Sequence, residues 1–176
     1  TSASTIPSTQ ISGGGLVHIK SQTANNSSVI NFVNGTSDVV FDSTYDHYVL
    51  YGRDIYGSNG DSIRIEITND TGSTYKNGGY RTIQFRTIYE NGSAASGQRS
   101  TTGVFFESFY NLSTTSTKHT SMEVHFWSPS DTKFPMVSGR FDGMDNDNIT
   151  AQIIAGYYNT STSYDGFRLK LGSGNL

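Results

Sequence analysis

Several short segments of the chain alternate strictly between apolar and polar residues, and this pattern restricts the fold more than any other feature. In an extended strand, "SIRIEIT" (62–68) and "GFRLKL" (166–171) each place their large apolar side chains on one side and their charged side chains on the other. No segment shows the 3.6-residue period of a long amphipathic helix. The pattern predicts a domain that is nearly all β.

Similar short segments follow one another along the chain, separated by Gly, Asn, Asp, Ser and Pro. Strands at this spacing predict an antiparallel two-sheet β-sandwich that is jelly-roll-like. Residues 69–80 and 91–102 are interpreted as long loops, which are often contact surfaces. We expect strands at 16–20, 28–34, 47–55, 62–68, 81–90, 103–112, 119–127, 133–141, 149–159 and 166–171.

Alternation also predicts which side chains face the core. We expect Ile63, Ile65 and Ile67 to point inward, and Ile83 and Phe85 to do the same on their strand. The segments 48–51 and 104–110 are apolar on both sides, so their outer faces need a cover. Either the flanking loops or another subunit can provide it.

The chain of 176 residues is long enough for one well-filled core, and we expect a single β-sandwich domain over residues 16–176. Residues 1–15 are rich in Ser, Thr and Gly and end in three consecutive glycines. This composition predicts a flexible N-terminal arm, which a neighbouring subunit would order. There is no cysteine, so no disulfide can form.

The charged residues exclude some partners. The 12 basic and 15 acidic residues are scattered singly, so the sequence shows no basic stripe for phosphate groups and nucleic acid is not an expected partner. No apolar run approaches the roughly 18 residues of a membrane span, so no membrane partner is expected either.

The stretch "SGRFDGMDNDNIT" (138–150) concentrates acidic residues and raises the question of a metal site. Calcium needs six to eight oxygen ligands, to which Asp142, Asp145 and Asp147 could contribute, but the spacing does not match an EF-hand loop. Asp and Asn also favour plain turns. We interpret the stretch as a turn between two strands, with these aspartates as weak metal candidates and no cofactor expected.

Two groups of residues are candidates for contact with a partner. One face of the strand 119–127 carries His119, Ser121, Glu123, His125 and Trp127. This row is interpreted first as a plain solvated sheet face, with subunit contact, which Trp127 favours, and a transition-metal site as the alternatives. The second group consists of tyrosines in Gly- and Asn-rich segments, namely Tyr56, Tyr75, Tyr80 and Tyr164. Exposed rings in such segments either bind sugars or proteins or cap the ends of the sandwich.

No nucleophile motif is present, so no catalytic residue and no enzymatic activity is expected.

Three stretches resemble a module of small structural proteins and tail fibres of marine bacteriophages, including those that infect cyanobacteria. They are "SGGGLVHIKSQTA" (12–24), "VVFDSTYDHYVLYGRDI" (39–55) followed by "DSIRIEIT" (61–68), and "GYYNTSTSYDGFRLKLGSGNL" (156–176). The resemblance implies an antiparallel β-sandwich on the virion surface, present in multiple copies and without catalytic residues.

The expected function is therefore that of a non-enzymatic virion structural protein, a tail fibre, knob or capsid decoration protein. Its expected partners are copies of itself, other virion proteins and a host-surface glycan. A lectin-like carbohydrate-binding module is the alternative, since the tyrosine-bearing loops also suit sugar binding.

Overall fold

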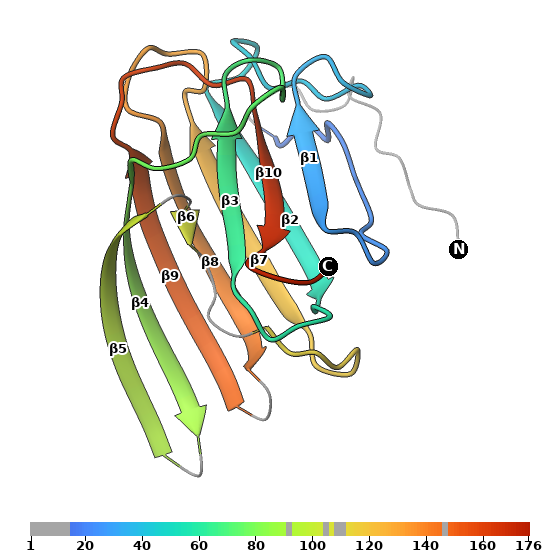
Figure 1. The fold of residues 1–176 in the computed structure, drawn as a ribbon, viewed down its shortest axis with the longest axis vertical. Coiled ribbons are helices and arrows are strands. Elements are labelled where there is room, and N and C mark those ends of the chain that lie inside the picture. Colours follow the sequence, from blue (N-terminus) through green and yellow to red (C-terminus); the bar gives the residue numbers. More distant parts are fainter. Residues whose placement is uncertain (1–14, 91–92, 104–105, 108–111, 146–147) are drawn as a thin grey trace.

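The computed structural model describes residues 15–90, 93–103, 106–107, 112–145 and 148–176, which form two antiparallel sheets packed face to face (Figure 1). The six-stranded sheet has the order β2-β7-β8-β9-β4-β5, and the four-stranded sheet has the order β1-β10-β3-β6. The expected all-β sandwich is thus confirmed. The strands are β1 (Val29–Val33), β2 (His47–Ile55), β3 (Ile63–Thr68), β4 (Tyr80–Glu90), β5 (Ser93–Gly103), β6 (Phe106–Glu107), β7 (Thr120–Trp127), β8 (Met136–Asp145), β9 (Asn148–Tyr158) and β10 (Gly166–Leu171).

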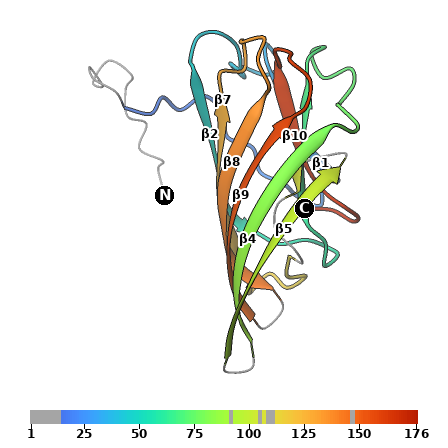
Figure 2. The same ribbon diagram turned by 90° about the vertical axis from the view of Figure 1, so that its left-hand side faces the viewer.

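The strand order is that of a jelly roll with an added hairpin. The chain crosses from one sheet to the other after β1, β2, β3, β5, β6 and β9, so its first and last strands pair with each other, as do β2 and β7. The pair β8 and β9 lies between β7 and β4 and widens the larger sheet (Figure 2), which twists strongly from β2 to β5. In the described ranges there is no helix that could span a membrane.

The core lies between the two sheets. Ile63, Ile65 and Ile67 are no more than 1 % exposed, which confirms the inward face expected for this strand. Aromatic rings fill the centre, where Phe126 stacks on Phe167 with ring centroids 4.2 Å apart and Phe41 meets the Phe126 ring edge-on at 5.6 Å. Packing of this kind, rather than any covalent link, holds the sheets together.

The sheets approach each other closely at Gly156 in β9. A Cβ atom there would lie 2.7 Å from the backbone oxygen of Arg81 and 2.8 Å from the ring of Phe106. Only glycine fits without displacing the neighbouring strand.

Two expected elements differ in the structure. Residues 93–103, interpreted as loop, form β5, which pairs with β4 along its whole length. This segment consists of Ser, Thr, Ala and Gly with Gln98 and Arg99, so it has no apolar alternation to reveal it, and the backbone of β4 provides the pairing. Residues 16–20, expected as a strand, pair with no strand in the part of the chain that is described.

Candidate contact surface

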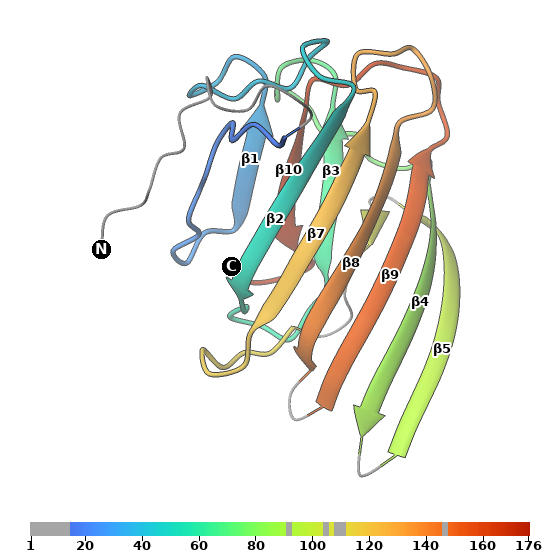
Figure 3. The ribbon, with the colours of Figure 1, turned by 180° about the vertical axis from the view of Figure 1, so that it is seen from behind.

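The outer face of the six-stranded sheet is strongly apolar, and Figure 3 looks directly onto it. Tyr51 of β2 is 60 % exposed on this face, and eight further large side chains on β4, β7, β8 and β9 are between 37 % and 62 % exposed. We call the set of eight the apolar face. Its members are Ile83, Phe85 and Tyr89 of β4, Trp127 of β7, Met136 of β8, and Ile149, Ile153 and Tyr157 of β9.

Strand pairing places these residues side by side. Phe85 is the register partner of Ile153, and Tyr89 is the partner of Ile149. On the other side of β9, Tyr157 is opposite Met136, which in turn is opposite Trp127. The residues therefore form rows of two or three apolar side chains on neighbouring strands, and Arg140 and Arg81 continue two of these rows.

The size of the apolar face exceeds what a monomer usually exposes. A large side chain covers roughly 150 to 250 Å², so half-exposure leaves about 100 Å² on each and about 800 Å² on the face. The largest exposed apolar patch of a typical monomer is about 300–600 Å². A standard protein interface buries about 800 Å² on each partner, so this face alone is large enough for one.

The orientation of β4 corrects a sequence prediction. Ile83 and Phe85 were expected to face the core, but they are 44 % and 51 % exposed. The residues between them turn inward, and Gln84 is buried where its side-chain oxygen accepts a hydrogen bond of 2.9 Å from Gln152 of β9. This polar pair replaces the expected apolar one, although Gln152 Oε1 is buried without a hydrogen-bond partner among the described residues.

One corner of the apolar face holds a stack of three rings. His47 of β2 lies parallel to Trp127 at 4.1 Å and to His125 at 5.0 Å between ring centroids. His47 Nε2 and His125 Nδ1 are 2.8 Å apart and share one hydrogen bond, and His125 Nε2 lies 2.9 Å from a Glu123 carboxylate oxygen. Burial, with the neighbouring His125 ring, lowers the pKa of His47. The stack fixes the orientation of the half-exposed Trp127.

The expected face of this strand is confirmed, since Ser121, Glu123, His125 and Trp127 all point away from the core. Its imidazoles are engaged in pairs, with His119 Nδ1 lying 3.4 Å from a carboxylate oxygen of Asp54. Among the described residues, no group of three acidic, His or Cys side chains is arranged to hold a metal ion.

The acidic stretch does not lie in a turn as a whole, contrary to expectation. β8 continues to Asp145 and β9 starts at Asn148, so Asp142 and Asp145 belong to a strand. Asp142 points outward and its carboxylate lies 2.6 Å from Nε of Arg140 on the same strand. Asp147 falls outside the described residues, and the metal interpretation stays a prediction that gains no support from Asp142.

The four candidate tyrosines divide into two kinds. Tyr80 and Tyr164 are 0 % and 2 % exposed, so the expectation that they are exposed contact residues is wrong. Tyr80 OH accepts from the backbone N–H of Ile67, Tyr164 OH donates to the backbone oxygen of Trp127, and burial raises the pKa of both phenols. Tyr56 is 44 % exposed and stays a candidate contact.

Tyr75 is half-buried and is used within the chain. It comes from the loop between β3 and β4, and its ring lies over the guanidinium group of Arg168 at 4.1 Å. Glu66, buried on the same side of the four-stranded sheet, pairs with Arg168 at 2.5 Å and with Lys170 at 2.9 Å. The outer face of the smaller sheet is therefore charged and internally paired, which leaves the larger sheet as the apolar one.

Alternation shows which side chains share a face of β4. It does not show that Gln84, rather than Ile83 and Phe85, faces the core, and this orientation is what exposes the apolar side chains. Trp127 was predicted from the sequence to be a contact residue, whereas Met136, Ile149, Ile153 and Tyr157 were not. Comparisons of the chain with protein-family models, curated proteins and solved structures found no match.

Proposed function

We propose that the chain is a non-enzymatic structural protein of a bacteriophage particle, exposed on the virion surface as a tail fibre, knob or capsid decoration protein. It acts by packing the apolar face against further copies of itself or other virion proteins. The observation that carries this proposal is the exposure of the eight large side chains of the apolar face, which are between 37 % and 62 % exposed. Jelly rolls are common in capsid proteins, which supports the proposal by analogy of fold only.

Charges near the apolar face are arranged in a way that suits burial. Arg140 lies 2.6 Å from Asp142, and Glu123 lies 2.9 Å from His125. A charge that brings its own partner costs less to remove from water than a single charge does. A neighbouring subunit can therefore cover the face without supplying a counter-ion for these groups.

Native mass spectrometry over a range of concentrations tests this proposal. We expect the wild type to form oligomers and Ile149→Glu to be monomeric, because the new carboxylate would be buried between the uncharged neighbours Tyr89 and Met144. Tyr56→Glu is the matched control, since Tyr56 is comparably exposed but lies outside the apolar face. A wild type that stays monomeric at high micromolar concentration and does not bind virion components overturns the proposal.

A lectin-like carbohydrate-binding module is the second candidate, and Trp127 is the observation that favours it. This ring is 46 % exposed and held rigidly by His47, and the polar groups of Glu123 and Arg140 lie on the same face of the sheet. An ordered aromatic ring beside hydrogen-bonding groups suits a sugar. Glycan-array binding that is lost in Trp127→Ala supports this function, and no binding to any glycan counts against it.

A further inference from the structure

We propose that the histidine pair, His47 and His125, is a pH-sensitive switch that holds Trp127 in the apolar face at neutral pH and releases it on acidification. The release of Trp127 is a property of the single chain. Its consequence, that assembly through the apolar face depends on pH, rests on the proposed function.

The carboxylate of Glu123 determines which nitrogen of His125 carries a proton. His125 Nε2 lies 2.9 Å from a carboxylate oxygen of Glu123, and an ionised carboxylate only accepts hydrogen bonds. His125 therefore carries its proton on Nε2, and its Nδ1 is left as an acceptor. His47 Nε2 lies 2.8 Å from that Nδ1, so His47 is the donor. The neutral histidine pair thus has one arrangement of protons that satisfies both short contacts.

The indole ring of Trp127 depends on this arrangement for its position. It is parallel to the His47 ring within 8° at 4.1 Å between centroids, and to the His125 ring within 15° at 5.9 Å. Its Nε1 lies 3.4 Å from Oγ of Ser138, which is close to the limit of a hydrogen bond. The stack on His47 is therefore the contact that chiefly fixes an indole that is 46 % exposed.

The histidine pair can take up one proton without breaking its hydrogen bond, but not two. The first added proton goes to Nδ1 of His47, which takes no part in either contact, and His47 Nε2 still donates to His125. A second proton goes to Nδ1 of His125 and removes the acceptor. Two N–H groups would then face each other at 2.8 Å between two positive rings, so the rings separate and His47 leaves Trp127.

The surroundings of His47 place proton uptake on the acidic side. Burial, with the neighbouring His125 ring, lowers the pKa of His47 from its ordinary value. The neutral arrangement therefore persists at pH 7, and protons are taken up only below about pH 6.5. Among the described groups His125 is the charged neighbour that lowers the pKa of His47, so the two rings titrate as a coupled pair.

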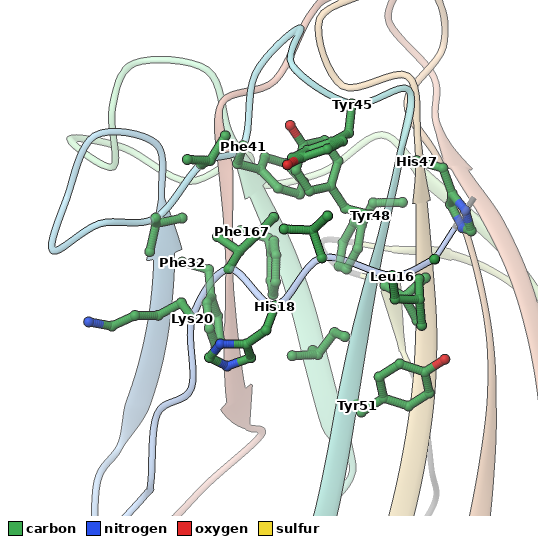
Figure 4. Close-up of a pocket in the computed structure, with 18 residues that line it drawn as sticks. Leu16, His18, Lys20, Phe32, Phe41, Tyr45, His47, Tyr48, Tyr51 and Phe167 are labelled. Atoms are coloured by element: carbon green, nitrogen blue, oxygen red, sulfur yellow. The ribbon is translucent and has the colours of Figure 1, made fainter. Parts of the chain in front are cut away.

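Other titratable groups surround the histidine pair without entering its hydrogen bonds. His18 and Lys20 line the cleft beside β2, and Figure 4 shows both on the β1 side of β2, with the His47 ring away from them. The remaining groups that flank the pair are Tyr45, Asp46 and Tyr51, with Arg140 and Asp142 paired at 2.6 Å and Asp131 and Lys133 paired at 2.6 Å.

Acidification also changes how easily this corner of the apolar face is buried. Trp127 is opposite Met136, which is opposite Tyr157, so release of the indole removes one end of a row of the face. Glu123 can compensate one of the two added charges, and the other would be buried without a partner. A neighbouring subunit therefore covers the corner less favourably at acidic pH.

Spectroscopy of Trp127 tests the switch directly, because it is the only tryptophan of the chain. Its indole N–H gives a single signal in the ¹⁵N NMR spectrum of the dilute protein, which can be followed from pH 8 to 4.5. We expect this signal to move toward the position of a free indole as the pH falls below about 6.5. The shift should precede any change in the far-UV circular dichroism of the sheets.

Three variants separate the switch from a general sensitivity to acid. His125→Gln supplies an amide oxygen that accepts from His47 at any pH, so the indole signal should stay at its neutral position throughout. Glu123→Gln removes the negative charge that favours proton uptake, so the midpoint of the transition should move to lower pH. His119→Gln is the matched control, because His119 lies beside Asp54 at 3.4 Å and outside the pair, and it should leave the transition unchanged.

A wild-type indole signal that stays in place until the sheets unfold overturns the proposal, as does an equal transition in His125→Gln. Native mass spectrometry at pH 7.5 and 5.5 tests the consequence, and we expect the oligomer fraction of the wild type to fall several-fold at the lower pH and that of His125→Gln to stay constant. An indole transition without oligomers at either pH supports the switch and rejects the proposed function. Oligomers that form equally at both pH values reject the control of assembly by the switch.

Discussion

The two faces of β9 give the sharpest stability prediction. Ile153 and Ile154 are adjacent in sequence, but Ile153 is 60 % exposed on the apolar face and Ile154 is 1 % exposed in the core. Ile154→Ala removes three buried carbon groups at about 0.8 kcal/mol each and leaves a cavity, so we expect the free energy of unfolding to fall by about 3 to 4 kcal/mol. The same substitution at Ile153 is expected to cost less than about 1 kcal/mol.

Thermal and urea unfolding of the dilute protein measures both values. Dilution matters because assembly would stabilise the folded state by mass action. For a chain of this length, 3 to 4 kcal/mol corresponds to a loss of roughly 10 °C in Tm. Equal losses for the two variants, or a larger loss for Ile153→Ala, would refute the assigned faces of β9 and with them the apolar face.

Three further substitutions test other parts of the structure. Gly156→Ala should lower stability by about 1 to 3 kcal/mol in urea unfolding, because its methyl group would be pressed against a backbone oxygen. Gln84→Leu should destabilise more than the double variant with Gln152→Leu, because the single change strands a buried amide, and a double-mutant cycle measures the coupling. The lowered pKa of His47 means that the unfolded chain binds more protons below about pH 6.5, so stability should fall as the pH drops through the folded-state pKa. His47→Gln should flatten this slope in unfolding measured from pH 5 to 8, and an unchanged slope would rule out the assignment to His47.

The sequence was sufficient to predict a strand and its buried face where the alternation of apolar residues and the strand propensity agree. "SIRIEIT" became β3 with its three isoleucines buried, and "HYVLYGRDI" became β2 with the predicted bounds. A strand that is half apolar and half charged has only one face that can be buried, so the local pattern determines its orientation.

The pattern was insufficient to predict which face of β4 is buried, because either set of alternate side chains can be accommodated in the core. Which set faces inward depends on Gln152, which lies 68 residues away and supplies the partner for Gln84. Long-range pairing of this kind has no local signature. The prediction that Tyr80 and Tyr164 are exposed was wrong because backbone groups can satisfy a buried tyrosine hydroxyl. Tyr80 OH bonds to backbone groups of Ile67 and Lys76, and Tyr164 OH donates to the backbone oxygen of Trp127.

Hydroxyl-radical oxidation of the methionines tests the central claim most directly. Met136 is 54 % exposed in the centre of a row of the apolar face, and Met122 is 6 % exposed in the core, so the second serves as an internal control. We expect Met136 to be oxidised in the dilute protein and protected in the assembled particle, while Met122 stays protected in both. Equal oxidation of Met136 in the dilute and assembled states would contradict the claim that this face is a contact surface.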